Sequence, residues 1–285
     1  MTETPPPPQP QPAPNPQPTT PPPAGRRMSR GSRTALIVTL AVVTVAIVVG
    51  LVTIGTVLRG GGVGGSYADT ATADAGTRVL ATVPNASVDL RPSPDDQVHV
   101  DARGTYFGAA PTLRVTTSGG VTSISGGCPN QWFGFCSVKL TVRLPAALPL
   151  NVVAQNGRLT AAGLTGALDL ETTNGAILTE GSRGDLKLQT TNGAIDVRDS
   201  SSRRVTATTT NGGVELDFLD PPSAVEARST NGALTVRVPA DGVTYRVDAR
   251  TTNGEIETGS VPSDPSSRRS LTAATTNGKV TVEAR

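Results

Sequence analysis

Residues 168–195 read LDLETTNGAILTEGSRGDLKLQTTNGAI, in which the pattern Leu-x-Leu-x-Thr-Thr-Asn-Gly-Ala-Ile occurs twice. The dipeptide Asn-Gly recurs before and after it, and successive copies are spaced by 18, 18, 19, 20, 22 and 24 positions. The asparagines of these copies are Asn156, Asn174, Asn192, Asn211, Asn231, Asn253 and Asn277. Periods near 20 residues are typical of solenoids, in which each repeat forms one layer of a stack.

Apolar side chains alternate with other side chains on both sides of each Asn-Gly. The residue seven positions before each glycine is Leu or Val, and the residue two positions after it is Leu, Ile or Val. Alternation with a period of two predicts a half-buried β-strand on each side of the turn. All variation in the period lies in the connector that follows this block, as expected for variable loops on one side of a stack.

Two all-β architectures fit this pattern. In a meander, Asn-Gly forms two-residue hairpin turns and neighbouring strands are antiparallel. In a parallel β-solenoid (β-helix), each repeat is one coil, and equivalent residues stack about 4.8 Å apart. We favour the solenoid, because each inward position keeps its residue type from repeat to repeat. The asparagines are then predicted to form a structural ladder. The same prediction covers the threonines directly before them, which are Thr173, Thr191, Thr210, Thr230, Thr252 and Thr276.

Weaker copies of the pattern precede the clear repeats at 150–285. Pro84-Asn85-Ala86 has Val79 and Val83 in the matching columns, and the segments LRVTTSGGVTSIS (113–125) and VKLTVRLP (138–145) read as further strands. We therefore assign residues 77–285 to one solenoid domain, with atypical terminal repeats as caps. The last strand predicted, Val280 to Val282, has no cap after it and is expected to be an open edge.

The first 76 residues divide into three segments. Residues 1–34 hold 12 of the 24 prolines and carry four arginines against one glutamate, so we predict a disordered, basic-flanked Pro-rich tail. Residues 35–58 are uncharged and apolar. At about 1.5 Å per residue this run is long enough for one transmembrane helix. Residues 59–76, which contain GGGVGG, are predicted to be a flexible linker.

A cleaved signal peptide is the competing interpretation of the apolar run. It fits less well, because the preceding segment is long and no small-x-small cleavage site follows closely. Arg26, Arg27, Arg30 and Arg33 precede the run, whereas Arg59 alone follows it directly. The positive-inside rule then puts the N-terminus in the cytoplasm and the C-terminal domain outside the cell membrane.

Two cysteines enclose the segment Cys128-PNQWFGF-Cys136. In an extracytoplasmic domain they are expected to form a disulfide. Trp132, Phe133 and Phe135 lie in this loop and are the candidate binding residues, since exposed rigid aromatics dominate many binding sites. The alternative is that the loop folds back as a hydrophobic lid over the first coil.

The sequence holds little catalytic chemistry. His99 is the single histidine, and no nucleophile-elbow, zinc-protease, phosphate-loop or calcium-loop motif is present. We therefore expect no catalytic residues, no metal and no cofactor. Paired carboxylates are the remaining candidates for catalysis. Stacking of the coils is expected to bring Asp196 beside Glu215, and Glu226 beside Asp248. The net charge after residue 34 is close to zero, which argues against a nucleic acid partner.

The run LTVRLPAALPLNVVAQNGRLTAAGLTGALDLETTNGAILTE with the following Thr-Thr-Asn-Gly units resembles the bacterial putative-adhesin family, a β-strand-repeat domain of unknown function. The resemblance covers residues 79–285 and implies a β-helical domain on a cell envelope. It supplies no catalytic residues.

Three functional hypotheses follow from these features. The first is a single-pass membrane protein that presents the solenoid as an adhesin-like module for an envelope glycan or protein. The second is an envelope sensor whose Pro-rich tail engages a cytoplasmic partner. The third and least favoured is a solenoid polysaccharide lyase or hydrolase that uses the paired carboxylates.

Overall fold

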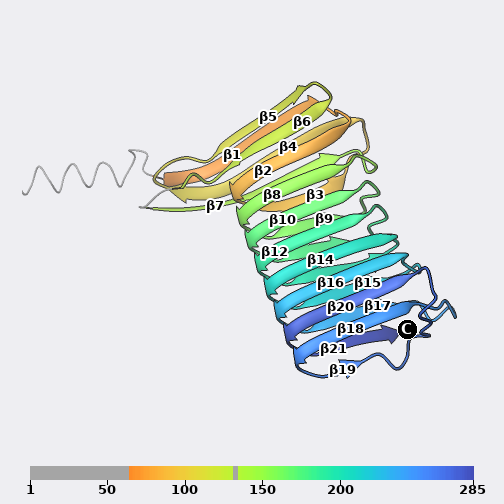
Figure 1. Ribbon diagram of the computed structural model, residues 1–285. Coiled ribbons are helices and arrows are strands. Elements are labelled where there is room, and N and C mark those ends of the chain that lie inside the picture. The colour runs from red at the N-terminus through yellow and green to blue at the C-terminus, as the bar shows by residue number, and fades with distance from the viewer. Residues whose placement is uncertain (1–63, 131–133) are drawn as a thin grey trace, which may run out of the picture. The chain divides into compact units, whose positions relative to one another are not determined.

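The computed structural model describes residues 64–130 and 134–285, which contain β-strands and loops (Figure 1). Gly62–Arg285 is a compact unit, and its strands form two sheets. The eleven-stranded sheet contains β1 (Gly64–Asp74), β4 (Gln97–Phe107), β7 (Phe135–Leu144), β3 (Ser87–Pro92), β9 (Leu159–Ala162), β11 (Ile177–Glu180), β13 (Ile195–Ser200), β15 (Val214–Phe218), β17 (Leu234–Val238), β21 (Val280–Ala284) and β19 (Ile256–Glu257), in that spatial order. The ten-stranded sheet contains β18 (Arg246–Asn253), β20 (Ser270–Asn277), β16 (Ala224–Asn231), β14 (Arg204–Asn211), β12 (Leu186–Asn192), β10 (Leu168–Asn174), β8 (Leu150–Asn156), β2 (Arg78–Asn85), β6 (Val121–Gly127) and β5 (Thr112–Ser118).

Each clear repeat forms one coil with a strand in each sheet. β10 ends at Asn174, the chain turns at Asn174-Gly175, and β11 begins at Ile177 in the other sheet. Successive coils pair in parallel and in register, so Asn174 lies opposite both Asn156 and Asn192. The hairpin meander is therefore wrong for these repeats, because the two strands that flank Asn-Gly do not pair with each other. The described part of the chain is all-β, with long parallel sheets of the kind a solenoid forms.

The alternating apolar residues fill the space between the two sheets. Leu168 and Leu170 on β10 and Ile177 on β11 are buried, as are the residues in the same columns of the neighbouring coils. One continuous core results, in which each apolar residue stacks on the apolar residue of the same column in the next coil. The outward residues of the same strands are polar or charged, as the period of two predicts.

The glycine of each Asn-Gly turn is required by close stacking of the backbone. A Cβ atom added to Gly175, Gly193 or Gly254 would lie 2.0 Å from the carbonyl oxygen of the glycine on the neighbouring coil. No real Cβ atom approaches an oxygen so closely, so any larger residue must push the coils apart. The turn therefore repeats with glycine at the corner for a steric reason.

The asparagines of the turns form one ladder of side-chain hydrogen bonds. Asn174 Nδ2 donates to Asn156 Oδ1 and Asn192 Nδ2 donates to Asn174 Oδ1, each over 2.8 Å. The same bond links Asn211, Asn231, Asn277 and Asn253 in turn, and it links Asn156 to Asn85 on β2. Every amide in the ladder points the same way, so the ladder has a donor end beyond Asn85 and an acceptor end at Asn253.

The hydroxyl column lies one position earlier than the sequence predicted. Thr190 is buried and its Oγ1 donates to the Gly175 carbonyl over 2.9 Å, whereas Thr191, directly before Asn192, is exposed. The other members of the bonded column are Thr172, Thr209, Ser229, Thr251 and Thr275, each donating to a glycine carbonyl of the adjacent coil. These hydroxyls satisfy carbonyl groups at the corner, and the threonines next to the asparagines do not.

Antiparallel strands close the N-terminal end of the unit. β1 pairs with β4, β4 pairs with β7, and β5 pairs with β6 across a turn at Gly119-Gly120. The predicted linker over 59–76 is thus wrong for residues 64–74, which form β1. Their alternating Tyr67, Ala71 and Ala73 allow this segment to act as a strand, although its glycines and lack of large apolar residues resemble a linker.

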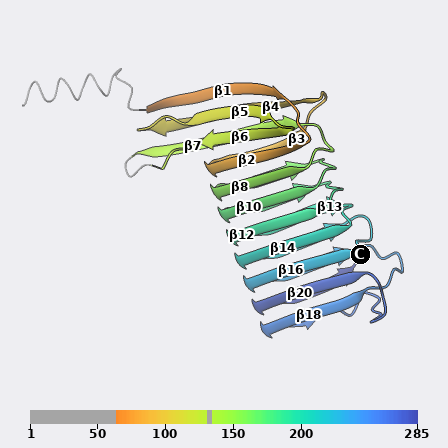
Figure 2. The same ribbon diagram turned by 45° about the horizontal axis from the view of Figure 1, so that its top comes forward.

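The spatial order of the strands differs from the sequence order at the other end. β20 lies between β16 and β18 (Figures 1 and 2). β21 lies between β17 and β19. The final repeat is therefore inserted into the stack, and the edge coil is formed by β18 and β19. The expectation that Val280 to Val282 is the open edge is wrong for this reason.

The predicted Pro-rich tail and the predicted transmembrane helix over 35–58 lie outside the described residues. In the part of the chain that the structure describes, no helix has the length and apolar character to cross a membrane.

Replacement of a corner glycine is expected to destabilise the domain. Gly193→Ala places a Cβ against the Gly175 carbonyl, and overpacking of this kind costs about 1–3 kcal/mol or more. Gly259→Ala is the matched control, because a Cβ there meets no atom within 4 Å. Urea unfolding of the purified domain measures both. Equal free energies of unfolding for the two variants would contradict the steric explanation.

The offset of the hydroxyl column predicts different effects for two adjacent threonines. Thr190→Val removes the donor to the Gly175 carbonyl and is expected to lower the free energy of unfolding by about 1 kcal/mol. Thr191→Val changes an exposed side chain and is expected to stay within about 0.5 kcal/mol of the unchanged protein. Thermal unfolding of both variants tests this, and a reversed order would refute the assignment.

Candidate functional site

The predicted disulfide is present and joins the end of β6 to the start of β7. Cys128 follows Gly127, and Cys136 is the second residue of β7. Cys128 is 4% exposed and its amide donates to the Asn85 carbonyl over 3.2 Å. Gly127, with φ of +107°, gives the chain the backbone conformation that leads from β6 to the cysteine. The disulfide loop is therefore fastened to the corner of the β2 coil.

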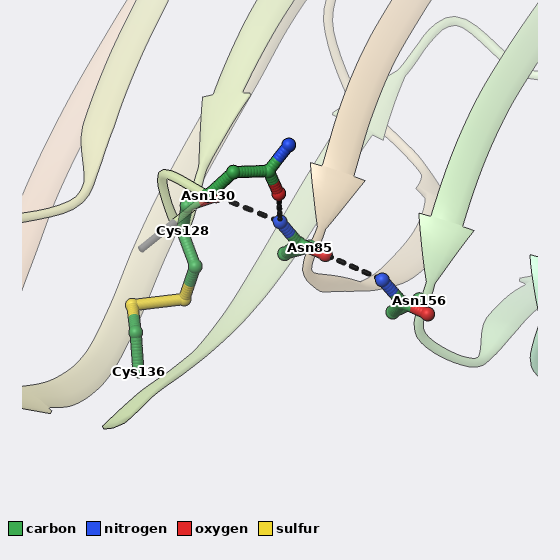
Figure 3. Close-up of a disulfide and its surroundings, with 5 residues drawn as sticks. All are labelled: Asn85, Cys128, Asn130, Cys136 and Asn156. Atoms are coloured by element: carbon green, nitrogen blue, oxygen red, sulfur yellow. Dashed lines mark hydrogen bonds between the residues drawn. A yellow bond between two sulfur atoms is a disulfide. The ribbon is translucent and has the colours of Figure 1, made fainter. Parts of the chain in front are cut away.

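The asparagine ladder ends at this disulfide loop. Asn85 Nδ2 donates to Asn130 Oδ1 over 2.8 Å and to the Cys128 carbonyl over 3.1 Å, and Asn156 donates to Asn85 (Figure 3). The amide nitrogen of Asn130 points away from Asn85 in this view, and no acceptor for it is found among the described residues. Asn130 thus presents the unused donor at the end of a row of aligned amides.

A hollow of about 390 Å³ lies beside the disulfide. Its wall includes Asn85, Asn130 and Asn156, together with Phe135, Ser87 and the disulfide itself. Among the described residues, every side chain that lines it is neutral. Amide donors, amide acceptors and an aromatic ring therefore face one concave surface, the combination by which binding pockets orient small polar ligands.

Phe135 is the candidate aromatic that the structure describes, and it is 60% exposed. Its ring stacks on Phe107, with ring centroids 6.1 Å apart and planes inclined by 11°. Phe135 is therefore held by a neighbour while one face of its ring remains open, which argues against a lid role for this residue. Trp132 and Phe133 lie outside the described residues.

One of the two predicted carboxylate pairs is brought together. Asp196 lies opposite Glu215 on adjacent strands, but each has an arginine partner, Arg198 and Arg237 respectively. The hydrogen bond to Asp196 raises the pKa of Arg198, and the hydrogen bond to Glu215 raises the pKa of Arg237. These carboxylates are engaged in ion pairs on the outer face of the eleven-stranded sheet.

The second predicted carboxylate pair is not formed. Glu226 and Asp248 both lie opposite Thr272, one on each side, because β20 is inserted between their strands. The expectation of neighbouring carboxylates assumed that coils stack in sequence order, and the inserted final repeat breaks that order.

A second hollow, of about 540 Å³, lies on the outer face of the ten-stranded sheet. Its charged side chains include two ion pairs, Lys187 with Asp169 at 3.1 Å and Arg204 with Asp185 at 3.3 Å. These side chains already satisfy one another. The hollow beside the disulfide is the stronger candidate, since the terminal amide donor of Asn130 has no acceptor in the part of the chain that the structure describes.

Sequence reasoning found the cysteines and Phe135 but missed Asn130 and Phe107. Asn130 lies outside every repeat, and Phe107 lies 28 residues before Phe135 in the chain, so no spacing rule connects them. Pairing of β4 with β7, which places Phe107 opposite Phe135, is the fact that brings the two rings together.

Reduction of the disulfide is expected to destabilise the domain. A cross-link between residues eight positions apart stabilises by roughly 2–3 kcal/mol on the chain-entropy model. Thermal unfolding with and without a phosphine reductant measures the loss. The double variant Cys128→Ser/Cys136→Ser is the control and should be insensitive to the reductant. An unchanged unfolding temperature on reduction would show that the bond adds nothing.

The chain is similar in structure to a "putative cell adhesion protein" from Clostridium sporogenes, with 8% identity, 78% of this chain and 100% of that chain covered, and a TM-score of 0.36. It is similar to a "putative adhesin" from Parabacteroides merdae, with 12% identity, coverages of 76% and 95%, and a TM-score of 0.43. It is also similar to a "putative lipid binding protein" from Parabacteroides distasonis, with 10% identity, coverages of 75% and 96%, and a TM-score of 0.26. No curated protein matches the chain.

Residues 148–285, which contain every coil from β8 onward, match the family described as Toastrack DUF4097. The resemblance to a β-strand-repeat family of unknown function is thereby confirmed, and residues 148–285 are similar to Toastrack DUF4097 domains.

Proposed function

We propose that this protein is a single-pass, membrane-anchored cell-surface protein whose β-domain is an adhesin-like binding module. The module binds a neutral envelope glycan in the hollow beside the Cys128–Cys136 disulfide. One observation carries this proposal: Asn130, at the end of the amide ladder, and the exposed ring of Phe135 line the same concave, uncharged surface.

The chemistry of the hollow suits a sugar better than a charged ligand. Asn130 offers an amide donor to a hydroxyl oxygen, and an aromatic ring offers an apolar face to the C–H groups of a sugar ring. Because Phe135 is held by Phe107 and Asn130 by Asn85, both groups are positioned before a ligand arrives. A site positioned in advance avoids part of the ordering cost of binding.

The anchor rests on the sequence alone. The uncharged run over 35–58 is preceded by four arginines, which favours a cytoplasmic N-terminus and an external β-domain. The disulfide supports the same placement, because disulfides persist in oxidising compartments.

Binding of the oxidised domain, residues 62–285, to an array of neutral envelope oligosaccharides tests the proposal. Asn130→Ala and Phe135→Ala are each expected to weaken binding about tenfold, equivalent to roughly 1.4 kcal/mol. Leu219→Ala is the matched control, since Leu219 is another large apolar residue, 54% exposed, that does not line the hollow.

Circular dichroism and thermal unfolding establish that each variant keeps the fold. An array in which proteins or lipid vesicles bind and the oligosaccharides do not would refute the glycan assignment. Equal binding by Phe135→Ala and the unchanged domain would refute the location.

A further inference from the structure

The coil formed by β18 and β19 is the last in both sheets and has a neighbour on one side (Figure 2). Elsewhere in the stack the corner glycine donates its amide to the asparagine carbonyl of the next coil, as Gly278 does to Asn253 over 3.0 Å. Among the described residues, Gly254 has no such acceptor, and neither does the amide of Ile256. The edge coil thus presents the backbone groups that another strand would pair with.

Side chains that point into the core are uncovered on this coil. Ile256 is 47% exposed, whereas Val214, Leu234 and Val280 in the same column are at most 2% exposed. Val247 and Ala249 are half-buried, although the equivalent residues of the inner coils are buried. The end of the core is therefore open to solvent at β18 and β19.

The direction of the free backbone groups on β18 follows from its pairing with β20. Arg246 donates its amide to the Arg269 carbonyl over 2.8 Å, so it faces β20. Alternate residues of a strand face the same neighbour, and the amides and carbonyls of Val247, Ala249 and Thr251 therefore face the open edge.

The outward side chains of β18 alternate in charge as Arg246, Asp248 and Arg250, and Arg250 Nε forms an ion pair with Asp248 Oδ1 over 2.8 Å within the strand. If two copies of β18 pair antiparallel about Ala249, Asp248 of each copy lies opposite Arg250 of the other. Ala249 then lies opposite its own copy, and Val247 lies opposite Thr251. A shift of the pairing centre by one residue toward the N-terminus, to Asp248, places Asp248 opposite Asp248 and Arg246 opposite Arg250, which is repulsive. The charges thus select one register for a like strand.

We propose that the β18–β19 edge is a docking surface for a second copy of this chain. The two ten-stranded sheets join by antiparallel pairing of β18 with β18 about Ala249. The partner's β18 satisfies the free amides, its coil covers Val247, Ala249 and Ile256, and two reciprocal Asp248–Arg250 pairs form across the junction. Such an isologous contact closes on itself and stops at a dimer.

The position of this edge determines where the N-terminal strands of the two copies lie in the dimer. β1 and β19 are at opposite ends of the eleven-stranded sheet, so joining two copies at β18 and β19 leaves their β1 strands at the two far ends. The chain enters each domain through β1. If each chain is anchored as in the proposed function, on which this step rests, the dimer links two membranes and the protein is a homophilic adhesin.

Charge reversal on β18 tests the docking surface. Sedimentation of the oxidised domain, residues 62–285, is expected to show a monomer–dimer equilibrium. Asp248→Arg and Arg250→Asp should each raise the dimer dissociation constant about tenfold or more, because two like-charge pairs then face each other. The double variant Asp248→Arg/Arg250→Asp restores opposite charges and should return the constant to within about threefold of its original value.

The chain offers a matched control on an inner strand. Glu226 and Arg228 on β16 form the same ion pair two residues apart, and β16 already has neighbours on both sides. Glu226→Arg should leave self-association unchanged. Beads coated with the domain should clump, and beads coated with either single β18 variant should not.

Folding of every variant is checked by circular dichroism. A domain that remains monomeric at about 100 µM, with beads that do not clump, overturns the inference. So does a folded double variant that fails to dimerise. The oligosaccharide array is run on the same variants, and Asp248→Arg should still bind glycan. Loss of glycan binding alone therefore counts against the proposed function, and loss of dimerisation alone counts against the docking surface.

Discussion

The close approach of the glycine corners is the constraint on which the rest of this structure depends. A Cβ added to Gly193 would lie 2.0 Å from the carbonyl oxygen of Gly175 on the neighbouring coil. Because glycine has no Cβ, the coils can stack directly upon one another. Direct stacking puts each residue of a coil in register with its equivalents. Leucine then packs on leucine inside, asparagine bonds to asparagine at the corner, and threonine reaches the glycine carbonyl of the next coil.

The asparagine ladder runs from the disulfide loop to the open coil. Its amides all point the same way, so one end presents a donor at Asn130 and the other an acceptor at Asn253. The donor end meets the disulfide loop, where Phe107 and Phe135 add an aromatic wall. The acceptor end lies on the open coil, where the charges of β18 suit a second copy of the chain. The two proposed binding surfaces are thus different terminations of one repeated array.

Sequence patterns predicted most of the repeat region because its information is local. Alternation identified the inward columns, and the period located each corner. The threonine prediction was wrong by one position because Thr172 and Thr173 are both threonine, and the choice between them depends on which hydroxyl reaches a carbonyl of the adjacent coil. β1 was assigned to a linker because its strand character depends on pairing with β4, which no local pattern reveals.

The sequence by itself determined that the chain forms stacked β-coils with glycine corners, since each coil repeats the same apolar columns and the same Asn-Gly turn. The tertiary structure decided the order of those coils and the identity of the open edge. The physical reason is degeneracy: β18 and β20 carry matching columns, so either can pair with β16, and the backbone pattern of one strand cannot distinguish them. In the observed order of the coils, Tyr245, directly before β18, is buried and forms a β-bridge with Ser263 in the loop between β19 and β20. The observed order leaves β18 at the edge, and the tertiary structure separately brings Asn85 on β2 beside Asn130 and Phe135 of the disulfide loop.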